Sequence, residues 1–573
     1  KGKCFTDKTD ICNKLNEHFI NIGPSLANQL PTTHEDPTKY ISHSSPDSFM
    51  FRGICTYEVS DLINNLNINK ASIGIPTRCL KLACPNVSAA LAAVFNLSLM
   101  QGIVPDILKI SKVTPIDKGG EAADPFNYRP ISTLSQFTQV FEKLVYKQLI
   151  SYIEKHNILS EFQFGFRKGH STEQAITEIV DSFRSSVDSN QIVCGVFLDF
   201  AKAFDTVNHS ILLKKLEKYG IRGSPLQWFT SYLSNRQQYV SLDHTQSSTK
   251  TVLCGIPQGS TLGPLLFLLY INDIANSSKK LSFRLFADDT NVFTSSKSQH
   301  ELQSIMNHEL ILVKNWCDTN KLSINLKKTN FLIIKSTRKK LTTQFHIKLP
   351  CSDTDFFLEQ KDSIKYLGVL IDDKLNWKKH ISFISSRISR NTGVFFKLRH
   401  YLSPTQLRQL YYTLIYPYLS YAITAWGTST KTNIKTLQTK QNHVVRVIFF
   451  ASLYGKNTDS ALPYLNLLDI LTIENIHKLQ VLKSTLYWHK NELPEIFNDS
   501  FKYAKNVHSY NTRYAAKDNF YKTRFRTNIG RQTLPATATI LWQDLPSKFK
   551  QLSIFRFKKE VKHYLLTKQN SLN

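Results

Sequence analysis

The part of the sequence that most constrains the fold is residues 281–296, LSFRLFADDTNVFTSS, in which two adjacent acids interrupt an apolar run. The flanks are rich in β-branched and aromatic residues, a pattern typical of a β-hairpin with Asp288 and Asp289 at its tip. Like charges at close range raise each other's pKa, and a bound divalent cation removes that cost. The pair alone also fits an ordinary Asp-Asp turn, so the interpretation depends on a third carboxylate.

That third carboxylate is Asp199, near the end of the apolar stretch 191–200, QIVCGVFLDF. A nearly continuous apolar run of this length predicts a buried central strand. A carboxylate at its end, beside a hairpin tip with two more, can hold two metal ions about 3.5–4 Å apart, as in polymerases and nucleases. Asp205, six residues further on, is interpreted as a structural acid at a turn or a helix start.

Six motifs occur in order along the chain: QFGFRKGHST (163–172), FLDFAKAFD around Asp199, GIPQGSTLGPLLFLLYIND from Gly255, FADD (286–289), NLKKTNFLI (325–333) and KYLGVLID (365–372). Together they resemble the reverse transcriptases, or RNA-directed DNA polymerases, of non-LTR retrotransposons, and the jockey-like group in particular. The resemblance implies an α+β right-hand polymerase with fingers, a palm built on an antiparallel sheet, a helical thumb and flanking helical regions.

The resemblance also divides the chain. We expect an N-terminal linker or extension over 1–110, fingers and palm over 111–375, a helical thumb over 376–480 and a basic nucleic-acid-binding region over 481–573. In this family an endonuclease precedes the polymerase. Residues 1–110 leave no room for a domain of about 200 residues, so we expect that endonuclease to be missing from this chain, a fragment of a longer polyprotein.

The family assigns roles to the matching positions. Two Mg²⁺ ions, with Mn²⁺ as a substitute, are expected on Asp199, Asp288 and Asp289. Arg129 and Arg167 are expected to clamp the triphosphate of the incoming nucleotide, since guanidinium groups match phosphate oxygens. For each arginine a solvated surface position is the alternative.

Further roles concern the nucleotide and the primer. Phe204 would form an aromatic wall that clashes with a 2′-hydroxyl and so selects deoxynucleotides, although a core Phe is the competing interpretation. Gln258 and Gly259 belong to the loop beside the nucleotide. Lys328 would act as the general acid near the triphosphate, with Lys327 as its neighbour and competitor. The expected primer grip comprises Tyr366, Leu367 and Gly368.

The formal charge of +28 indicates a polyanionic partner, nucleic acid first and an anionic membrane surface second. From residue 501 onward fifteen Lys and Arg face three acids, with aromatic residues interleaved, a composition that suits phosphate contacts and base stacking. For each of these residues a solvated basic surface is the alternative. The expected partners are an RNA template, a DNA primer or target, and deoxynucleoside triphosphates. The candidate nucleic-acid contacts are Arg513, Lys522, Arg524, Arg526 and Arg531.

The nine Cys form no C-x-x-C pair, so neither a zinc knuckle nor a disulfide framework is expected, and we interpret them as reduced thiols of an intracellular protein. No run approaches 18 uninterrupted apolar residues, so no membrane partner is expected. Nuclear localisation with a cytoplasmic ribonucleoprotein stage follows from the implied task alone.

The predicted function is therefore copying of element RNA into DNA, primed at nicked chromosomal DNA. Two alternatives stay open. An RNA-templated RNA polymerase would use the same palm, and Phe204 argues against it. A catalytically decayed copy would only bind RNA, and the intact Asp199, Asp288 and Asp289 argue against that.

Overall fold

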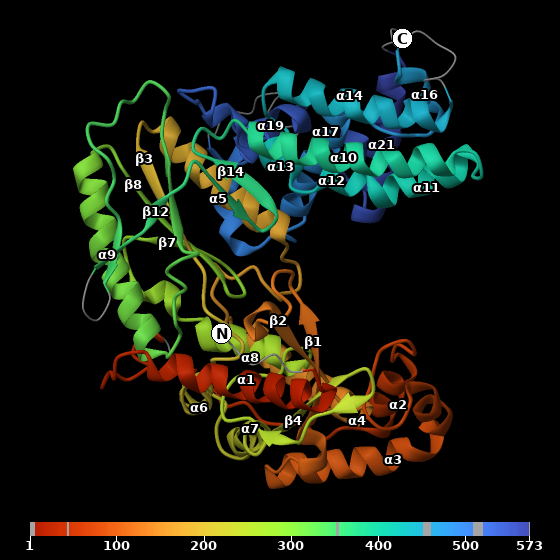
Figure 1. Cartoon of the computed structure of the whole chain (residues 1–573). Coiled ribbons are helices and arrows are strands. Elements are labelled where there is room, and N and C mark those ends of the chain that lie inside the picture. The colour runs from red at the N-terminus through yellow and green to blue at the C-terminus, as the bar shows by residue number, and fades with distance from the viewer. Residues whose placement is uncertain (1–5, 43–44, 351–354, 451–459, 508–518, 572–573) are drawn as a thin grey trace.

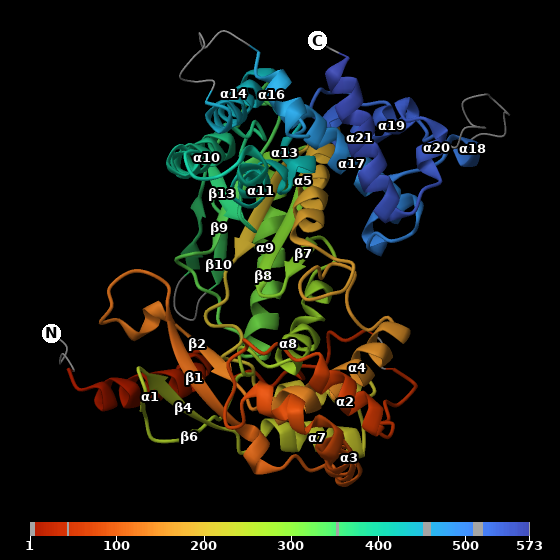
Figure 2. The ribbon, with the colours of Figure 1, turned by 90° about the vertical axis from the view of Figure 1, so that its right-hand side faces the viewer.

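The structure is a computed structural model that describes residues 6–42, 45–350, 355–450, 460–507 and 519–571. A central sheet lies between two lobes (Figures 1 and 2). The N-terminal lobe combines helices with a second sheet, and the C-terminal lobe is helical. The mixture of α and β structure agrees with the predicted class.

The central sheet is built around a strand buried on both faces, β3 (Ile192–Leu198), as the apolar run predicts. Its neighbours β8 and β9 are both antiparallel to it, β7 is antiparallel to β8, and β12 runs parallel to β9. The strand order is β12-β9-β3-β8-β7. The strands are β7 (Ser282–Phe286), β8 (Asp289–Ser296), β9 (Asn330–Ile334) and β12 (Glu359–Gln360).

Helices cover both faces of this sheet, because alternate residues of β3 point to opposite sides. Val193 and Phe197 pack into the hydrophobic core of helix α5 (Thr172–Asp188), whereas Cys194 and Val196 belong to the core of helix α9 (Gln299–Thr319). The hydroxyl of Ser171 accepts a hydrogen bond from the Gln174 N–H and so caps α5. The strand end that carries Asp199 is thereby fixed from two sides.

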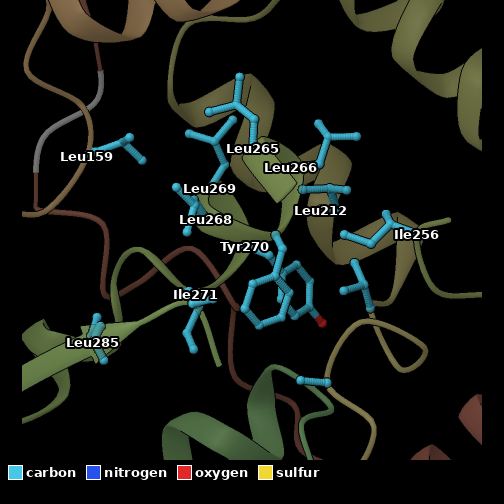
Figure 3. Packing of buried hydrophobic residues seen from close by; sticks show 14 of the residues in the cluster. Leu159, Leu212, Ile256, Leu265, Leu266, Leu268, Leu269, Tyr270, Ile271 and Leu285 are labelled. Atoms are coloured by element: carbon cyan, nitrogen blue, oxygen red, sulfur yellow. The ribbon is translucent and has the colours of Figure 1, made fainter. Parts of the chain in front are cut away.

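Helix α8 (Leu262–Ile271) is buried along its whole length and forms the centre of the larger core (Figure 3). Leu212 of α6 (His209–Lys218) packs against it, as does Ile256. Beneath α8 the buried Lys215 and Asp273 form an ion pair of 2.6 Å. Such a pair satisfies two charges that would otherwise be costly to bury.

The second sheet has the order β2-β1-β4-β5, and β6 also pairs with β4. β1 and β4 are parallel, whereas β1 and β2 are antiparallel. The strands are β1 (Ile110–Asp117), β2 (Tyr128–Thr133), β4 (Gln237–Leu242), β5 (Thr245–Gln246) and β6 (Lys250–Thr251). The surrounding helices are α1 (Lys8–Asn28), α2 (Thr56–Asn64), α3 (Thr77–Gln101), α4 (Gln136–Lys155) and α7 (Ser224–Leu233).

The N-terminal residues are part of this lobe rather than a detached linker. Helix α1 lies along β4 and β5, and the Asn16 amide donates to the Ser248 carbonyl at 2.9 Å. Residues from Ile41 to Leu108 share the core that contains α8. The expected boundary after residue 110 therefore coincides with the start of β1 but separates no independent core.

Helix α3 is long and apolar enough to cross a membrane by length and composition alone. The sequence prediction rested on uninterrupted apolar runs and passed over this segment, because Ser and Asn interrupt it. Helix α3 packs on α2 and α7, and a third of its most apolar stretch is buried in the fold.

The C-terminal lobe begins with the hairpin β13 (Ser363–Tyr366) and β14 (Val369–Asp372). The expected boundary after residue 480 falls inside α17, so the last two predicted regions share one helix and one core. The helices are α10 (Lys378–Leu398), α11 (Pro404–Leu414), α12 (Tyr416–Ser420), α13 (Ile423–Trp426), α14 (Lys431–Ile448), α16 (Leu462–Leu467), α17 (Ile473–His489), α18 (Ala504–Val507), α19 (Leu534–Asp544), α20 (Ser547–Lys550) and α21 (Ile554–Asn570).

A buried arginine of α5 joins the central sheet to this lobe. The guanidinium of Arg184 donates to the carbonyls of Ala425 at 2.6 Å and Gln532 at 2.7 Å. Asp188, at the end of the same helix, accepts hydrogen bonds from the backbone and hydroxyl of Thr527, each at 2.7 Å. Segments more than 300 residues apart are thus held on one helix.

Candidate active site

Three carboxylates meet at one end of the central sheet. Leu198 pairs with Thr290, so extending the antiparallel register by one residue sets Asp199 opposite Asp289. Asp288 occupies the turn between β7 and β8, as the sequence predicts. The backbone of Asp199 is fixed by Asn325, whose N–H donates to its carbonyl at 2.7 Å.

The electrostatics of this end disfavour three bare carboxylates. Partial burial, followed by the charges of Asp288 and Asp199, raises the pKa of Asp289 to about 6. Burial and the charge of Asp199 also raise the pKa of Asp288, against the opposing effect of Arg129. Without a bound cation, ionising these carboxylates therefore costs free energy.

The carboxylates fit a divalent cation for this reason, since oxygen ligands of adjacent acids are those that Mg²⁺ prefers. Within the described ranges no group of three His, Cys, Asp or Glu side chains already surrounds a common point. One or two protein carboxylates with substrate phosphates are enough for Mg²⁺, so a preformed protein cage is not required.

Four cations lie close to one another, and one of them, Arg129, acts on Asp288. Burial, followed by the charges of Lys202, Arg129 and Lys328, lowers the pKa of Lys118 to about 8. Lys118 follows β1 and its N–H donates to the Asn127 carbonyl at 2.8 Å, while Arg129 lies on β2. Lys202 donates to the Tyr128 carbonyl at 3.2 Å. The charge of Arg129 acts on Asp288, and Lys328 lies close enough to Lys118 to affect its pKa.

Lys118 and Lys202 were missed by the sequence analysis. Lys202 lies three residues after Asp199 inside the motif FLDFAKAFD, and Lys118 lies in the turn before a Gly-Gly pair. For Lys202 the available signal was its position in that motif. The sequence could not reveal that the β1–β2 turn folds over the turn after β3, because that contact is tertiary.

Phe204 is held by two other rings. It stacks on Phe267 of α8 with centroids 4.4 Å apart and meets Phe166 edge-on at 6.3 Å. Phe204 is only half-buried, so its ring retains an accessible surface. One side of the ring therefore packs on a core residue, and the role of Phe204 as a wall beside the sugar stays a prediction.

The loop that carries Gln258 and Gly259 is tied to β2 and to the turn after β3. The Ser132 N–H donates to the Gln258 carbonyl at 2.7 Å. A Cβ on Gly259 would lie 2.3 Å from the Ser132 carbonyl oxygen, so only glycine permits this approach. The Gln258 side chain donates to Asp205 at 2.7 Å, which gives that acid a partner beyond its own turn.

Arg167 is not brought to the carboxylates, which corrects its expected role. Its guanidinium donates to the carbonyls of Ser160 at 2.7 Å and Gln163 at 3.2 Å. The side chain lines a cavity of about 1,020 Å³ whose acids include Glu154 and Glu495. The loop is anchored along β7, which turns Arg167 away from the site.

The expected primer-grip residues form the tip of the β13–β14 hairpin. Tyr366 is buried against Phe197 and is a core residue. Burial, followed by the charge of Asp289, raises the pKa of its hydroxyl. Leu367 and Gly368 have φ values of 45° and 87° and make the turn. The Leu367 carbonyl accepts a hydrogen bond of 2.6 Å from the Tyr421 hydroxyl, which links the tip to the helical lobe.

The five residues expected to contact nucleic acid in the C-terminal region lie in different environments. Arg513 lies outside the described residues. Arg526 donates to the carbonyls of Asp188 at 2.7 Å and Val187 at 3.3 Å. Its guanidinium therefore links the C-terminal region to the end of α5. Lys522, Arg524 and Arg531 are exposed. One of the interleaved aromatic residues, Phe520, is a core residue.

Comparison with known proteins decides the family. Residues 116–371 match the family described as reverse transcriptase (RNA-dependent DNA polymerase). The chain carries a reverse transcriptase domain. All three carboxylates and the four cations fall within it. The family generally uses divalent metal ions, in agreement with the chemistry of the carboxylates.

Relatives of this domain include mobile-element proteins of Drosophila melanogaster. The chain is 30% identical over 415 residues to the probable RNA-directed DNA polymerase from transposon X-element, covering 70% of this chain and 44% of the relative. It is 27% identical over 482 residues to the RNA-directed DNA polymerase from mobile element jockey, covering 80% and 50%. The domain is of the jockey-like non-LTR kind, and the chain spans about half the length of the curated relatives it matches.

Proposed function

We propose that this chain is an RNA-directed DNA polymerase that extends a primer on an RNA template by two-metal nucleotidyl transfer. The observation that carries the proposal is the position of Asp199 opposite Asp289 and next to Asp288, inside a reverse transcriptase domain. The raised pKa of Asp289 adds support, because a site with mutually repelling carboxylates gains most from cations.

In this mechanism Asp199, Asp288 and Asp289 hold two divalent ions, Mg²⁺ with Mn²⁺ as a substitute. When bound, such ions lower the pKa of the primer 3′-hydroxyl and neutralise charge on the triphosphate. The 3′-oxygen attacks the α-phosphorus and the bond to pyrophosphate breaks. The protein contributes positioning and charge stabilisation, with no covalent intermediate.

The cations next to the carboxylates bind the triphosphate in this proposal. Arg129, Lys118 and Lys202 face the site from the β1–β2 turn and from the turn after β3. One lysine ammonium gives its proton to the leaving pyrophosphate. Lys328 is the expected donor, and Lys118 is a second candidate because its pKa of about 8 lies near the working pH.

Phe204 selects deoxynucleotides in this proposal. Its stacking on Phe267 holds the ring in place, so a 2′-hydroxyl at this position would clash with the ring. An RNA-templated RNA polymerase is the competing function and would tolerate that hydroxyl. Gln258 and Gly259 complete the nucleotide side of the site.

The right-hand arrangement follows from the same proposal. The central sheet serves as the palm, the β1–β2–β4 sheet with its helices as the fingers, and the helices after residue 375 as the thumb. Residues 374–458 contain thirteen Lys and Arg and no acid, which supports a duplex path along the thumb. Leu367 and Gly368, with Tyr366 as their buried support, form the primer grip, and Lys522, Arg524 and Arg531 add distal contacts.

The biological setting is also a proposal. The chain would copy the element's own transcript at a nick in chromosomal DNA, in the nucleus and after a cytoplasmic ribonucleoprotein stage. A decayed copy that only packages RNA would share the fold and lack the reaction.

The test is primer extension on a poly(A) RNA template with Mg²⁺, comparing dNTPs with rNTPs for the natural chain and Asp288→Ala. We expect dNTP incorporation that the substitution abolishes, with RNA affinity retained. Equal use of rNTPs would transfer the function to RNA synthesis. No extension, with salt-sensitive RNA binding intact, would leave the packaging function.

A further inference from the structure

The segment before Arg167 adds an extra edge to the catalytic hairpin. The Leu285 N–H donates to the Phe162 carbonyl at 2.9 Å, and the Phe164 N–H donates to the Leu285 carbonyl at 2.8 Å. Gln163 and Leu285 form a parallel bridge. The loop and β7 therefore move as one unit.

The side chain of Gln163 reaches beyond this bridge to the turn itself. Gln163 is 1% exposed, and its Oε1 accepts hydrogen bonds from the Gly165 N–H at 2.8 Å and the Ala287 N–H at 2.9 Å. Ala287 directly precedes Asp288. One amide oxygen thus closes the loop and the catalytic turn together.

Ala287 needs such support because its backbone is left-handed, with a φ of 55°. An L-residue other than glycine adopts this conformation at a cost, and alanine has no polar side chain to offset it. Ala287 is also buried, so without Gln163 its N–H would lose its partner in a place that water does not reach.

Gly165 is the second part of this contact. A Cβ at Gly165 would lie 2.3 Å from the Ala287 nitrogen and 2.9 Å from the Phe286 carbonyl carbon. Any larger residue would push the turn that carries the two acids away. We name this arrangement of Gln163, Gly165 and Ala287 the turn clamp.

We propose that Gln163 is a positioning residue that holds Ala287 left-handed and thereby aims Asp288 and Asp289 at the metal ions. The inference rests on the proposed function, since it takes these carboxylates as the metal ligands. Gln163 itself touches neither metal nor substrate. Loss of an outer partner of a metal ligand typically weakens metal affinity or activity about 10- to 100-fold.

Two substitutions of Gln163 separate the amide oxygen from mere side-chain volume. Gln163→Met keeps the length of the side chain but removes the acceptor. Gln163→Glu keeps an acceptor oxygen, and it replaces Nε2, a buried atom with no partner within the described part of the chain. Gly165→Ala displaces the same turn by a steric route, so the inference stays testable if Gln163→Met folds poorly.

Gln441→Met is the matched control. Gln441 is fully buried in the C-terminal lobe, and its amide donates to the Tyr411 hydroxyl at 2.8 Å and the Leu471 carbonyl at 2.9 Å. Like Gln163→Met, the control removes two buried hydrogen bonds. It also removes the bond that Gln441 Oε1 accepts from the Gln438 amide at 2.8 Å, and none of the three reaches the catalytic turn.

The experiment measures Mn²⁺ binding to the full chain by electron paramagnetic resonance, and amide hydrogen exchange over 285–290 in EDTA. For Gln163→Met and Gly165→Ala we expect at least about tenfold weaker Mn²⁺ binding and faster exchange of the turn. Gln163→Glu should retain Mn²⁺ affinity within a few-fold, and Gln441→Met should match the natural chain in both measurements.

Primer extension distinguishes the two levels of failure. If the natural chain binds Mn²⁺ and extends a primer, but Gln163→Met and Gly165→Ala do so with unchanged Mn²⁺ dependence, the inference is overturned and the proposed function stands. If the natural chain neither binds Mn²⁺ nor extends a primer, the proposed function fails and the positioning role fails with it.

Discussion

Gln258 donates a hydrogen bond from Nε2 to Asp205 Oδ1 over 2.7 Å, which joins the glycine-rich loop to the turn after β3. Burial raises the pKa of Asp205 to about 6, although the Gln258 bond and the charge of Lys202 oppose the rise. The other oxygen, Oδ2, is buried without a partner in the residues the structure describes. The contact fixes which atom of the Gln258 amide remains for a ligand.

Replacing Asp205 should therefore act on nucleotide binding. We expect Asp205→Ala to raise KM for dNTPs about tenfold with a smaller effect on kcat, because hydrogen bonds to charged groups contribute roughly 1.5–3 kcal/mol. Asp205→Asn retains an acceptor and should stay close to the natural enzyme. Steady-state kinetics on a fixed RNA template check this. Equal loss of kcat, dNTP binding and RNA binding in Asp205→Ala would instead mean that the turn had unfolded.

The carboxylate at Asp289 gives a pH prediction for the metal-free protein. Its pKa of about 6 in the fold lies above the ordinary value of 3.8, so the fold favours the protonated form. This contribution to stability is present below about pH 4 and is lost as the pH rises through about 6. In EDTA at pH 7.5, Asp289→Asn should raise Tm above that of the natural chain.

The same difference should shrink at pH 5, where Asp289 is largely protonated. Adding Mg²⁺ at pH 7.5 should stabilise the natural chain more than the variant, because only the natural site gains from the cation. Thermal denaturation at the two pH values measures both effects. A lower Tm for Asp289→Asn in EDTA at pH 7.5 would contradict the repulsion between the carboxylates.

The two arginines expected at the triphosphate should behave differently. Arg129→Ala should raise KM for dNTPs about tenfold, since it removes a cation that acts on Asp288. Arg167→Ala should lower Tm and leave KM unchanged, because Arg167 only bonds to the carbonyls of its own loop. Paired kinetic and thermal measurements decide the matter, and the opposite pattern would restore Arg167 to the clamp.

Removal of the aromatic wall should relax sugar selection. We expect Phe204→Ala to raise rNTP use relative to dNTP use at least about tenfold, a change of about 1.4 kcal/mol in discrimination. Phe345→Ala removes another buried ring and serves as the control for general loss of packing. Competition between labelled dNTPs and rNTPs gives the ratio. Unchanged discrimination in Phe204→Ala would favour the core role alone.

Local patterns predicted the centre of this fold and tertiary contacts decided the rest. The apolar run ending at Asp199 and the hairpin around Asp288 depend on neighbours in sequence, so both were predictable. Arg167 and Arg526 have the residue types and motif positions of ligand contacts, yet their partners come from loop anchoring and from a helix far along the chain. Lys118 became a candidate only when the β1–β2 turn was seen to approach the turn after β3.

The order of the central sheet also governs how the chain is made. β3 leaves the ribosome well before β8 and β9, yet it is paired with both. During synthesis both edges of the apolar strand β3 stay unpaired until its partners are made, and β9 is complete only at residue 334. Open edges of this kind invite pairing with other chains. A product that ends between β3 and β8 would therefore expose both edges of β3 and aggregate.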